Sequence, residues 1–259
     1  MSFSAIDIAI KRRSEELRLR ESFVDAAAWP EAERSQERVD KRRKRCDDNF
    51  WAWDETYFPA EMYEGGKATP GLLQRRVVEH AKQPGIHLVI GPRKHGKTVT
   101  AKKYLAWALV TGRISVAGTY CETLPKASAM LDDIQWLLQN ARVAHDYQVE
   151  VLESNADQLR ARIGRSKLVT VAAFSEGRSV RGYTTGFSRP KFLLADDVET
   201  LDSSFTQPAV DGRIRRLGET YQSLDEGGTV LVLANNFKRE SAVNRLLTES
   251  EQGLLPERW

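Results

Sequence analysis

The chain has 259 residues, of which 41% are hydrophobic and 29% charged, a globular composition that excludes wholesale disorder. Its formal net charge of +3 is too small to indicate a nucleic-acid partner by itself. No apolar run approaches the roughly 18 residues of a membrane span. The two cysteines, Cys46 and Cys121, are too few for a disulfide framework or a metal cluster. These features predict a soluble, intracellular protein that does not contact membranes.

The composition divides the chain near residue 65. Residues 1–65 are dense in charge and are predicted to form a helical arm, and residues 66–259 are predicted to form the main domain. The aromatic cluster at 50–58 is expected to pack the arm against the rest of the protein. The basic run 41–45 (KRRKR) is interpreted as a solvated helix face, with contacts to nucleic-acid phosphates as the alternative.

Short apolar runs alternate with helical patterns beyond the arm. The runs predict strands at 86–90, 114–120, 168–174, 191–195 and 229–234. Helices are predicted at 98–110, at 124–140, between the last two strands and after the last one. Strands that are apolar on both faces and alternate with helices predict an α/β fold, in which a mostly parallel sheet is flanked by helices.

Residues 91–98 (GPRKHGKT) match the P-loop pattern G-x-x-x-x-G-K-[ST] between a predicted strand and a predicted helix. Glycines let backbone N–H groups surround phosphate oxygens, and the N-terminal end of a helix favours the same anion. Lys97 is expected to reach the β- and γ-phosphates of ATP, and the Thr98 hydroxyl to bind Mg²⁺. The predicted nucleotide-binding residues are therefore Gly91, Pro92, Arg93, Lys94, His95, Gly96, Lys97 and Thr98.

A carboxylate pair follows the apolar run at 192–195, as the acidic partner of such a loop requires. Asp196, at the strand end, is the expected Mg²⁺ partner. ATP hydrolysis also needs a carboxylate that orients and deprotonates water. Asp197 has the favoured position for this role, but the longer side chain of Glu199 could reach instead, so both remain candidates.

The distance between the two motifs leaves room for a strand inserted between the loop strand and the acidic strand. Two helical and at least two strand-like runs lie between Thr98 and Asp196. By analogy of fold, this insertion is typical of ring-forming motor ATPases and helicases. The sequence therefore predicts a P-loop NTPase of the ASCE/RecA-like class with an N-terminal helical arm.

Four segments between about residues 49 and 247 resemble the large terminase subunits of tailed bacteriophages. They are NFWAWDETYFP, GPRKHGKTVTAKKYLAWAL, TLPKASAMLDDIQWLLQNARVAHDY and GRSVRGYTTGFSRPKFLLADDVE. The resemblance implies an ATP-hydrolysing motor that moves double-stranded DNA into a procapsid through contacts with the DNA backbone. It also implies a homo-oligomeric ring, the portal protein and the small terminase subunit as partners, and action in the host cytoplasm at the procapsid portal.

The same resemblance suggests further site residues. Arg93 is a candidate for a γ-phosphate contact in cis, and Arg178 and Arg181 are candidates for an arginine finger that reaches a neighbouring subunit. LVLANNFKRES lies where the family has a coupling segment, which makes Asn235 a candidate nucleotide contact. That family also carries a C-terminal nuclease domain. No acid cluster follows here, so DNA cleavage is not expected from this chain alone.

Two other functions are compatible with these motifs. A RecA- or helicase-like DNA-dependent ATPase would share both motifs. A nucleotide-binding assembly module would bind ATP without turning it over.

Overall fold

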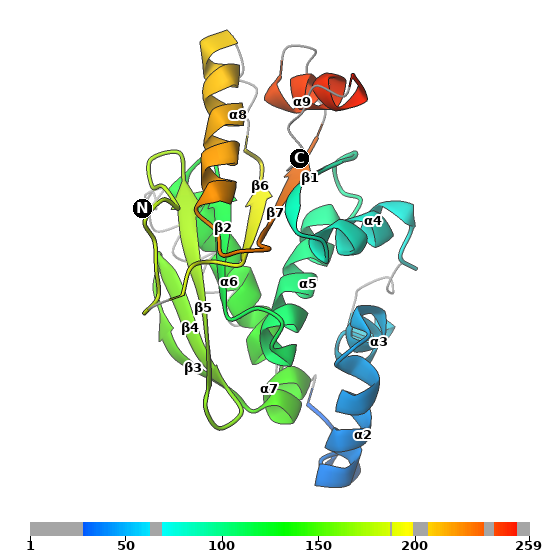
Figure 1. The fold of residues 1–259 in the computed structure, drawn as a ribbon. Coiled ribbons are helices and arrows are strands. Elements are labelled where there is room, and N and C mark those ends of the chain that lie inside the picture. Colours follow the sequence, from blue (N-terminus) through cyan, green and yellow to red (C-terminus); the bar gives the residue numbers. More distant parts are fainter. Residues whose placement is uncertain (1–27, 63–68, 187, 199–206, 236–240, 253–259) are drawn as a thin grey trace, which may run out of the picture.

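A seven-stranded mixed sheet forms the centre of the computed structural model, which describes residues 28–62, 69–186, 188–198, 207–235 and 241–252 (Figure 1). The strands are β1 (Gly85–Ile90), β2 (Val116–Cys121), β3 (Val149–Ser154), β4 (Gln158–Ile163), β5 (Lys167–Ser175), β6 (Phe192–Asp196) and β7 (Thr229–Ala234). Their order in the sheet is β1-β7-β6-β2-β5-β4-β3. The pairs from β1 to β5 are parallel, which confirms the predicted mostly parallel sheet.

One strand lies between the loop strand β1 and the acidic strand β6, as expected, but the long spacer between the motifs is not its source. This strand is β7, which pairs in parallel with both neighbours. It follows β6 in the chain and does not come from the segment between the two motifs. The extra residues in that segment instead form helices, β2, β5 and the β3–β4 hairpin.

The antiparallel β3–β4 hairpin, which the sequence analysis did not predict, extends the sheet beyond β5. Buried and more exposed side chains alternate along β4, as expected where the described helices cover only one face of this part of the sheet. A bulge between Val151 and Glu153 interrupts the pairing of the edge strand β3.

Helices cover the two faces of the central strands. In chain order the helical elements are η1 (Glu31–Glu33), α2 (Gln36–Cys46), α3 (Phe50–Tyr57), η2 (Ala60–Met62), α4 (Leu72–Ala81), α5 (Lys97–Thr111), α6 (Leu124–Gln139), α7 (Ala141–Tyr147), α8 (Gln207–Gln222) and α9 (Ala242–Glu251). One hydrophobic cluster joins the sheet to α4–α7, and a second joins it to α8 and α9. Within the described residues, no helix has the length and apolar character that crossing a membrane requires.

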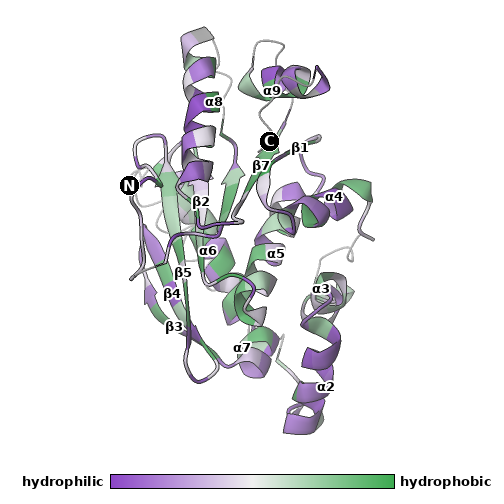
Figure 2. Cartoon of the chain, viewed as in Figure 1, coloured by the Kyte–Doolittle hydropathy of each residue, from purple (hydrophilic) through white to green (hydrophobic). Residues whose placement is uncertain are grey.

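The strand β6 shows why the central strands are apolar throughout. Phe192 and Leu194 belong to the cluster beneath α5 and α6, whereas Leu193 and Ala195 belong to the cluster beneath α8. All four side chains are buried because successive strand residues point to opposite, covered faces. Figure 2 shows the contrast between these green strands and the mainly purple, hydrophilic α2.

The aromatic segment at 50–58 lies in the same hydrophobic cluster as α5. Asn49 caps α3 by accepting hydrogen bonds from the backbone N–H groups of Trp51 and Ala52. This start directs Phe50 and Trp53 into the core, where both are at most 1% exposed. The aromatic side chains of α3 therefore hold the arm helices against α5, which covers the sheet.

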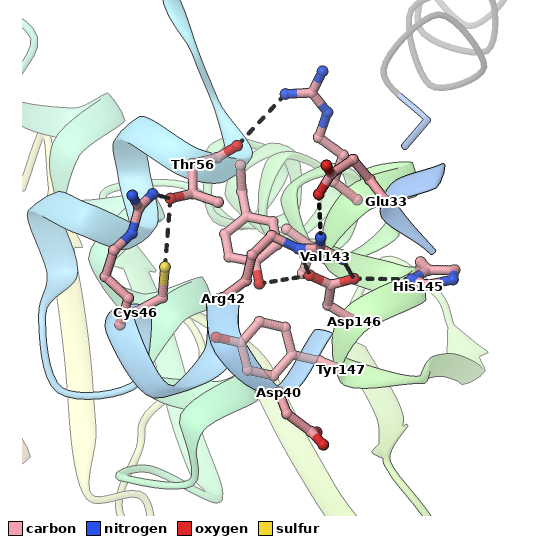
Figure 3. A network of polar contacts seen from close by, with 12 residues as sticks. Glu33, Asp40, Arg42, Cys46, Thr56, Val143, His145, Asp146 and Tyr147 are labelled. Carbon is pink, nitrogen blue, oxygen red and sulfur yellow. Dashed lines mark hydrogen bonds and ion pairs between the residues drawn. The ribbon is translucent and has the colours of Figure 1, made fainter. Parts of the chain in front are cut away.

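The basic run of α2 is largely solvated, as interpreted from the sequence, since Lys41, Lys44 and Arg45 are exposed, but Arg42 is engaged within the protein. Arg42 forms two hydrogen bonds, of 2.7 and 2.9 Å, with the buried Asp146 of α7 (Figure 3). Arg43 lies 5.0 Å from the ring centre of Tyr147, and Arg45 donates a hydrogen bond to Thr56. Arg42 and Arg43 therefore help to pack the arm against α7, whereas the contact of Arg45 lies within the arm.

Candidate functional site

The predicted motif residues converge at the carboxyl edge of the parallel strands. The loop at 91–96 follows β1, Asp196 is the last residue of β6, and Asn235 follows β7. Parallel strands bring these three segments to one edge of the sheet, where ligands of open α/β folds bind.

Two glycines give the loop at 91–96 its shape. A Cβ atom at Gly91 would come within 2.7 Å of the Leu73 side chain on α4. Gly96 precedes α5 with a φ of 74°, a left-handed conformation that glycine adopts without steric cost. Lys94 also has a positive φ, of 63°. The pattern therefore turns the chain sharply before the first turn of α5.

Lys97 is buried at the start of α5, and oxygen atoms surround its ammonium group. Its Nζ donates hydrogen bonds to the carbonyls of Gly91 and Pro92 at 2.7 and 2.8 Å, and to Oδ1 of Asn235 at 3.1 Å. Burial lowers the pKa of Lys97, an effect that Asp196 and the neighbouring Asp197 oppose. The arrangement holds a cation in the loop with neutral oxygen partners, which an anion can replace.

Thr98 and Asp196 connect the loop helix to the acidic strand. The Thr98 hydroxyl donates a hydrogen bond of 2.7 Å to Oδ2 of Asp196. Burial raises the pKa of Asp196, and the charge of Asp197 raises it further, while the hydrogen bond from Thr98 opposes the shift. This carboxylate therefore lacks enough positive partners in the protein to hold its pKa at the ordinary value.

Of the two candidate acids for activating water, Asp197 and Glu199, the structure describes Asp197. Asp197 is exposed and has a φ of 46°, in the left-handed region that few residues other than glycine adopt. In this conformation its backbone N–H donates to Oδ1 of Asp196 at 3.0 Å. Glu199 lies outside the described residues, so the choice between the two acids stays open.

Gln74 is a site neighbour that the sequence analysis missed. Its side chain, on α4, donates a hydrogen bond of 2.7 Å to the carbonyl of His95 and accepts one of 3.0 Å from the Gly71 backbone N–H. It thereby links the loop to the start of α4. The His95 Nδ1 atom, in turn, lies 2.7 Å from the Arg93 carbonyl oxygen.

The candidate arginines occupy different places. Arg93 is exposed in the loop. Arg178 forms an ion pair of 2.7 Å with Asp157, just before β4, and the exposed Arg181 follows it in the segment between β5 and β6. Within the described part of the chain, neither Arg178 nor Arg181 forms a hydrogen bond or ion pair with the loop at 91–98.

The protein oxygens at this site suit a magnesium ion whose other ligands are phosphate oxygens and water. Thr98 and Asp196 offer a hydroxyl and a carboxylate oxygen 2.7 Å apart. Among the described residues, no group of three or more His, Cys, Asp or Glu side chains is placed to hold a metal. Mg²⁺ typically binds one or two protein ligands, water and substrate phosphates, so two protein oxygens fit it.

Comparisons with known proteins identify similar folds. No protein-family model and no curated protein sequence matches the chain. The large terminase of bacteriophage HK97 superposes with a TM-score of 0.52 at 15% identity, over 80% of this chain and 42% of that one. A large terminase from a thermophilic bacteriophage, solved in complex with ADP, has a TM-score of 0.48 at 14% identity, over 71% and 43% of the two chains. The N-terminal domain of the bacteriophage phi29 DNA packaging ATPase has a TM-score of 0.43 at 15% identity, over 71% and 86%.

The sheet order and the loop at its carboxyl edge define a P-loop NTPase fold. More particularly, the chain shares the fold found in the large terminase of bacteriophage HK97, of which it spans less than half the length.

Proposed function

We propose that this chain is the ATPase motor domain of a viral DNA-packaging terminase, which hydrolyses Mg·ATP to move double-stranded DNA into a procapsid. The observation that carries the proposal is the 2.7 Å hydrogen bond between Thr98 and Asp196. It brings the phosphate-binding pattern and the acidic strand together across the inserted strand β7. The fold shared with the HK97 large terminase supports the choice of a packaging motor.

The loop at 91–98 binds the triphosphate in this proposal. Its backbone N–H groups and the N-terminal end of α5 surround the phosphate oxygens. Lys97 exchanges its present carbonyl and Asn235 partners for the β- and γ-phosphates, which are stronger acceptors because they are charged. Asn235 thereby comes into reach of the γ-phosphate end of the site.

Thr98 and Asp196 would hold Mg²⁺, which supplies positive charge to the β- and γ-phosphate oxygens when bound. The raised pKa of Asp196 supports this role, since a cation beside the carboxylate would favour its charged form. Asp197 or Glu199 accepts a proton from the water that attacks the γ-phosphorus.

An arginine completes the site in this proposal. Arg93 contacts the γ-phosphate in cis, or Arg178 or Arg181 reaches the nucleotide of a neighbouring subunit. A finger in trans requires a ring of subunits. Contacts with DNA are expected at backbone phosphates, since a packaging motor acts on every sequence. The portal protein and the small terminase subunit are the proposed partners at the procapsid.

Replacement of Lys97 tests the proposal. We expect Lys97→Ala to reduce ATP turnover by at least about 100-fold, because it removes a cation placed against the transferred phosphoryl group. Lys44→Ala, at an exposed lysine of α2, is the matched control and should retain turnover. A parent protein that binds ATP but never hydrolyses it, alone or assembled, would instead be a nucleotide-binding assembly module.

Two further measurements test the ring and then separate packaging from a helicase-like activity. Turnover per subunit should rise steeply with protein concentration if a neighbour supplies the finger, and Arg178→Ala or Arg181→Ala should reduce that rise. DNA uptake into procapsids should depend on Lys97. Strand separation of duplex DNA without uptake would favour the helicase-like function.

A further inference from the structure

A cavity of about 510 Å³ lies at the opposite edge of the sheet from the loop at 91–98. It is lined by the ends of α4 and α5 and by the first residues of β6 and β7, including Phe192 and Thr229. Because β1, β6 and β7 are parallel, their amino ends form this edge and their carboxyl ends form the other. The cavity is therefore separate from the proposed ATP site, and its volume is in the range of small-molecule sites.

Three cations line this cavity, and only one has an ionic partner there. Arg113 forms an ion pair of 2.7 Å with Asp48 and donates a hydrogen bond of 2.8 Å to the Asp47 carbonyl. Lys82 and Lys191 are exposed and form no ion pair within the described part of the chain. The Lys82 Nζ lies 5.9 Å from the centre of the Trp107 ring, which also lines the cavity, and neither lysine has a counter-charge among the described residues.

The wall of the cavity is rigid and can add a hydrogen bond. The Trp107 indole N–H donates to the Cys46 carbonyl at 3.0 Å, and the Arg113 guanidinium lies 4.7 Å from the Trp107 ring centre. Tyr104 also lines the cavity, and its hydroxyl has no hydrogen-bond partner among the described residues. Burial raises the pKa of Tyr104 to about 12, so the hydroxyl keeps its proton at neutral pH.

Helix ends alone do not account for these charges. Cations are stabilised near the C-terminal ends of helices, which explains Lys82 at the end of α4 and Arg113 after α5. Lys191 precedes a strand, β6, where no helix dipole favours a cation. An anion between Lys82, Lys191 and Arg113 would account for all three.

We propose that this cavity is a second anion site, which binds a phosphate group between Lys82, Lys191 and Arg113. The guanidinium, fixed by Asp48 and Trp107, orients the oxygens, and the two lysines supply charge that the protein does not neutralise. The phosphate comes either from the backbone of bound DNA or from a free phosphorylated compound. Both sources present the same group to the same three cations.

Charge reversal at the two lysines tests this site, with pyrophosphate as the probe. The full chain is first saturated with ADP and magnesium, so that the loop at 91–98 is occupied, and pyrophosphate binding is then measured by calorimetry. We expect Lys82→Glu and Lys191→Glu each to weaken binding by about tenfold or more, as expected for loss of a charged hydrogen-bond partner. Arg165→Glu, which alters the net charge equally at an exposed position in the β4–β5 turn, should change it less than about twofold.

A short DNA duplex distinguishes the two sources of phosphate. If the duplex displaces pyrophosphate, and each reversal lowers the slope of log affinity against log salt by about one, the site binds the DNA backbone. If pyrophosphate binds and the duplex does not displace it, the site binds a free phosphorylated compound. The proposal is overturned if pyrophosphate fails to bind and the duplex is unaffected by the reversals, or if Arg165→Glu has the same effect. Thermal unfolding of each variant serves as the control that the substitutions at these exposed positions leave the fold intact.

Discussion

Two aspartates of this protein, Asp146 and Asp196, have pKa values that are shifted in opposite directions by their surroundings. Burial alone would raise the pKa of Asp146, but hydrogen bonds from Arg42, His145 and Tyr57 more than offset it, so its pKa is lowered. These partners form the network in Figure 3. Asp196 receives hydrogen bonds from the Thr98 hydroxyl and the Asp197 N–H and lies beside a second carboxylate, so its pKa is raised.

The opposite pKa shifts indicate that Asp146 stabilises the fold, whereas Asp196 is suited to bind a cation. The protein itself supplies a positive charge beside the Asp146 carboxylate, because Arg42 forms an ion pair of 2.7 Å with it. Asp196 has no such positive charge held against it by the protein, and a bound cation would supply one. The same comparison predicts which substitution damages stability and which damages activity.

Asp196→Asn should produce the largest effect, and only on activity. The amide still accepts the Thr98 hydrogen bond but loses the charge that would hold Mg²⁺, so ATP turnover should fall at least about 100-fold. The melting temperature measured without nucleotide should equal that of the parent or exceed it by a few degrees, because a carboxylate with a raised pKa is replaced by a neutral group. A clear loss of stability would contradict the comparison.

Asp146→Ala should produce the opposite result. Removing the carboxylate leaves Arg42 without its main partner in a nearly buried position, which costs about 3–5 kcal/mol. The melting temperature should fall by roughly 10 °C, while turnover per folded molecule is retained. Glu150→Ala serves as the control, since its ion pair with Arg162 is exposed and its loss should cost less than about 1 kcal/mol.

The pH dependence of stability sharpens the comparison, because the two shifts have opposite signs. The lowered pKa of Asp146 adds stability above about pH 4, the ordinary value, and this is lost as the pH falls through the folded-state pKa. The raised pKa of Asp196 removes stability as the pH rises from about 4 through its folded-state value. In melting curves across pH, the deficit of Asp146→Asn should therefore shrink below about pH 4. The advantage of Asp196→Asn should grow above that pH.

Trp29→Leu should produce the smallest change and tests how the network of Asp146 is held. The guanidinium groups of Arg42 and Arg142 lie 4.2 and 4.5 Å from the centre of the Trp29 ring. Loss of these two contacts should cost about 1–2 kcal/mol, measured by denaturant unfolding, without an effect on turnover. A drop as large as that of Asp146→Ala would show that Trp29, and not the carboxylate, organises the network.

Much of the fold was predictable because its signals are local. The mainly apolar runs at 86–90 and 229–234 are strands, since runs as short as these suit a strand covered on both faces. The hairpin was missed although its signal is present: Gln158–Ile163 (QLRARI) alternates polar and apolar residues, as expected of a strand covered on one face. The origin of the inserted strand could not be predicted, because strand order depends on pairings between distant segments.

The part of the candidate site that could be predicted is the part formed by sequence motifs at the ends of predicted strands. The pattern at 91–98 and the acids after β6 placed Lys97, Thr98 and Asp196 together before any geometry was known. Gln74 carried no such signal, because it contacts the loop only after α4 and β1 pack against each other. The ion pair of Arg42 could not be predicted either, since its partner Asp146 is 104 residues away in the sequence.

The outer edge of β3 has a consequence for how copies of this protein can associate. A terminal strand offers unsatisfied backbone groups to which another chain can add a strand. Here a bulge breaks the regular spacing of the strand, and Glu150 places a charge on it. These features discourage edge-to-edge sheet extension and the fibres that follow from it. Copies that assemble in solution should therefore not join their sheets through β3.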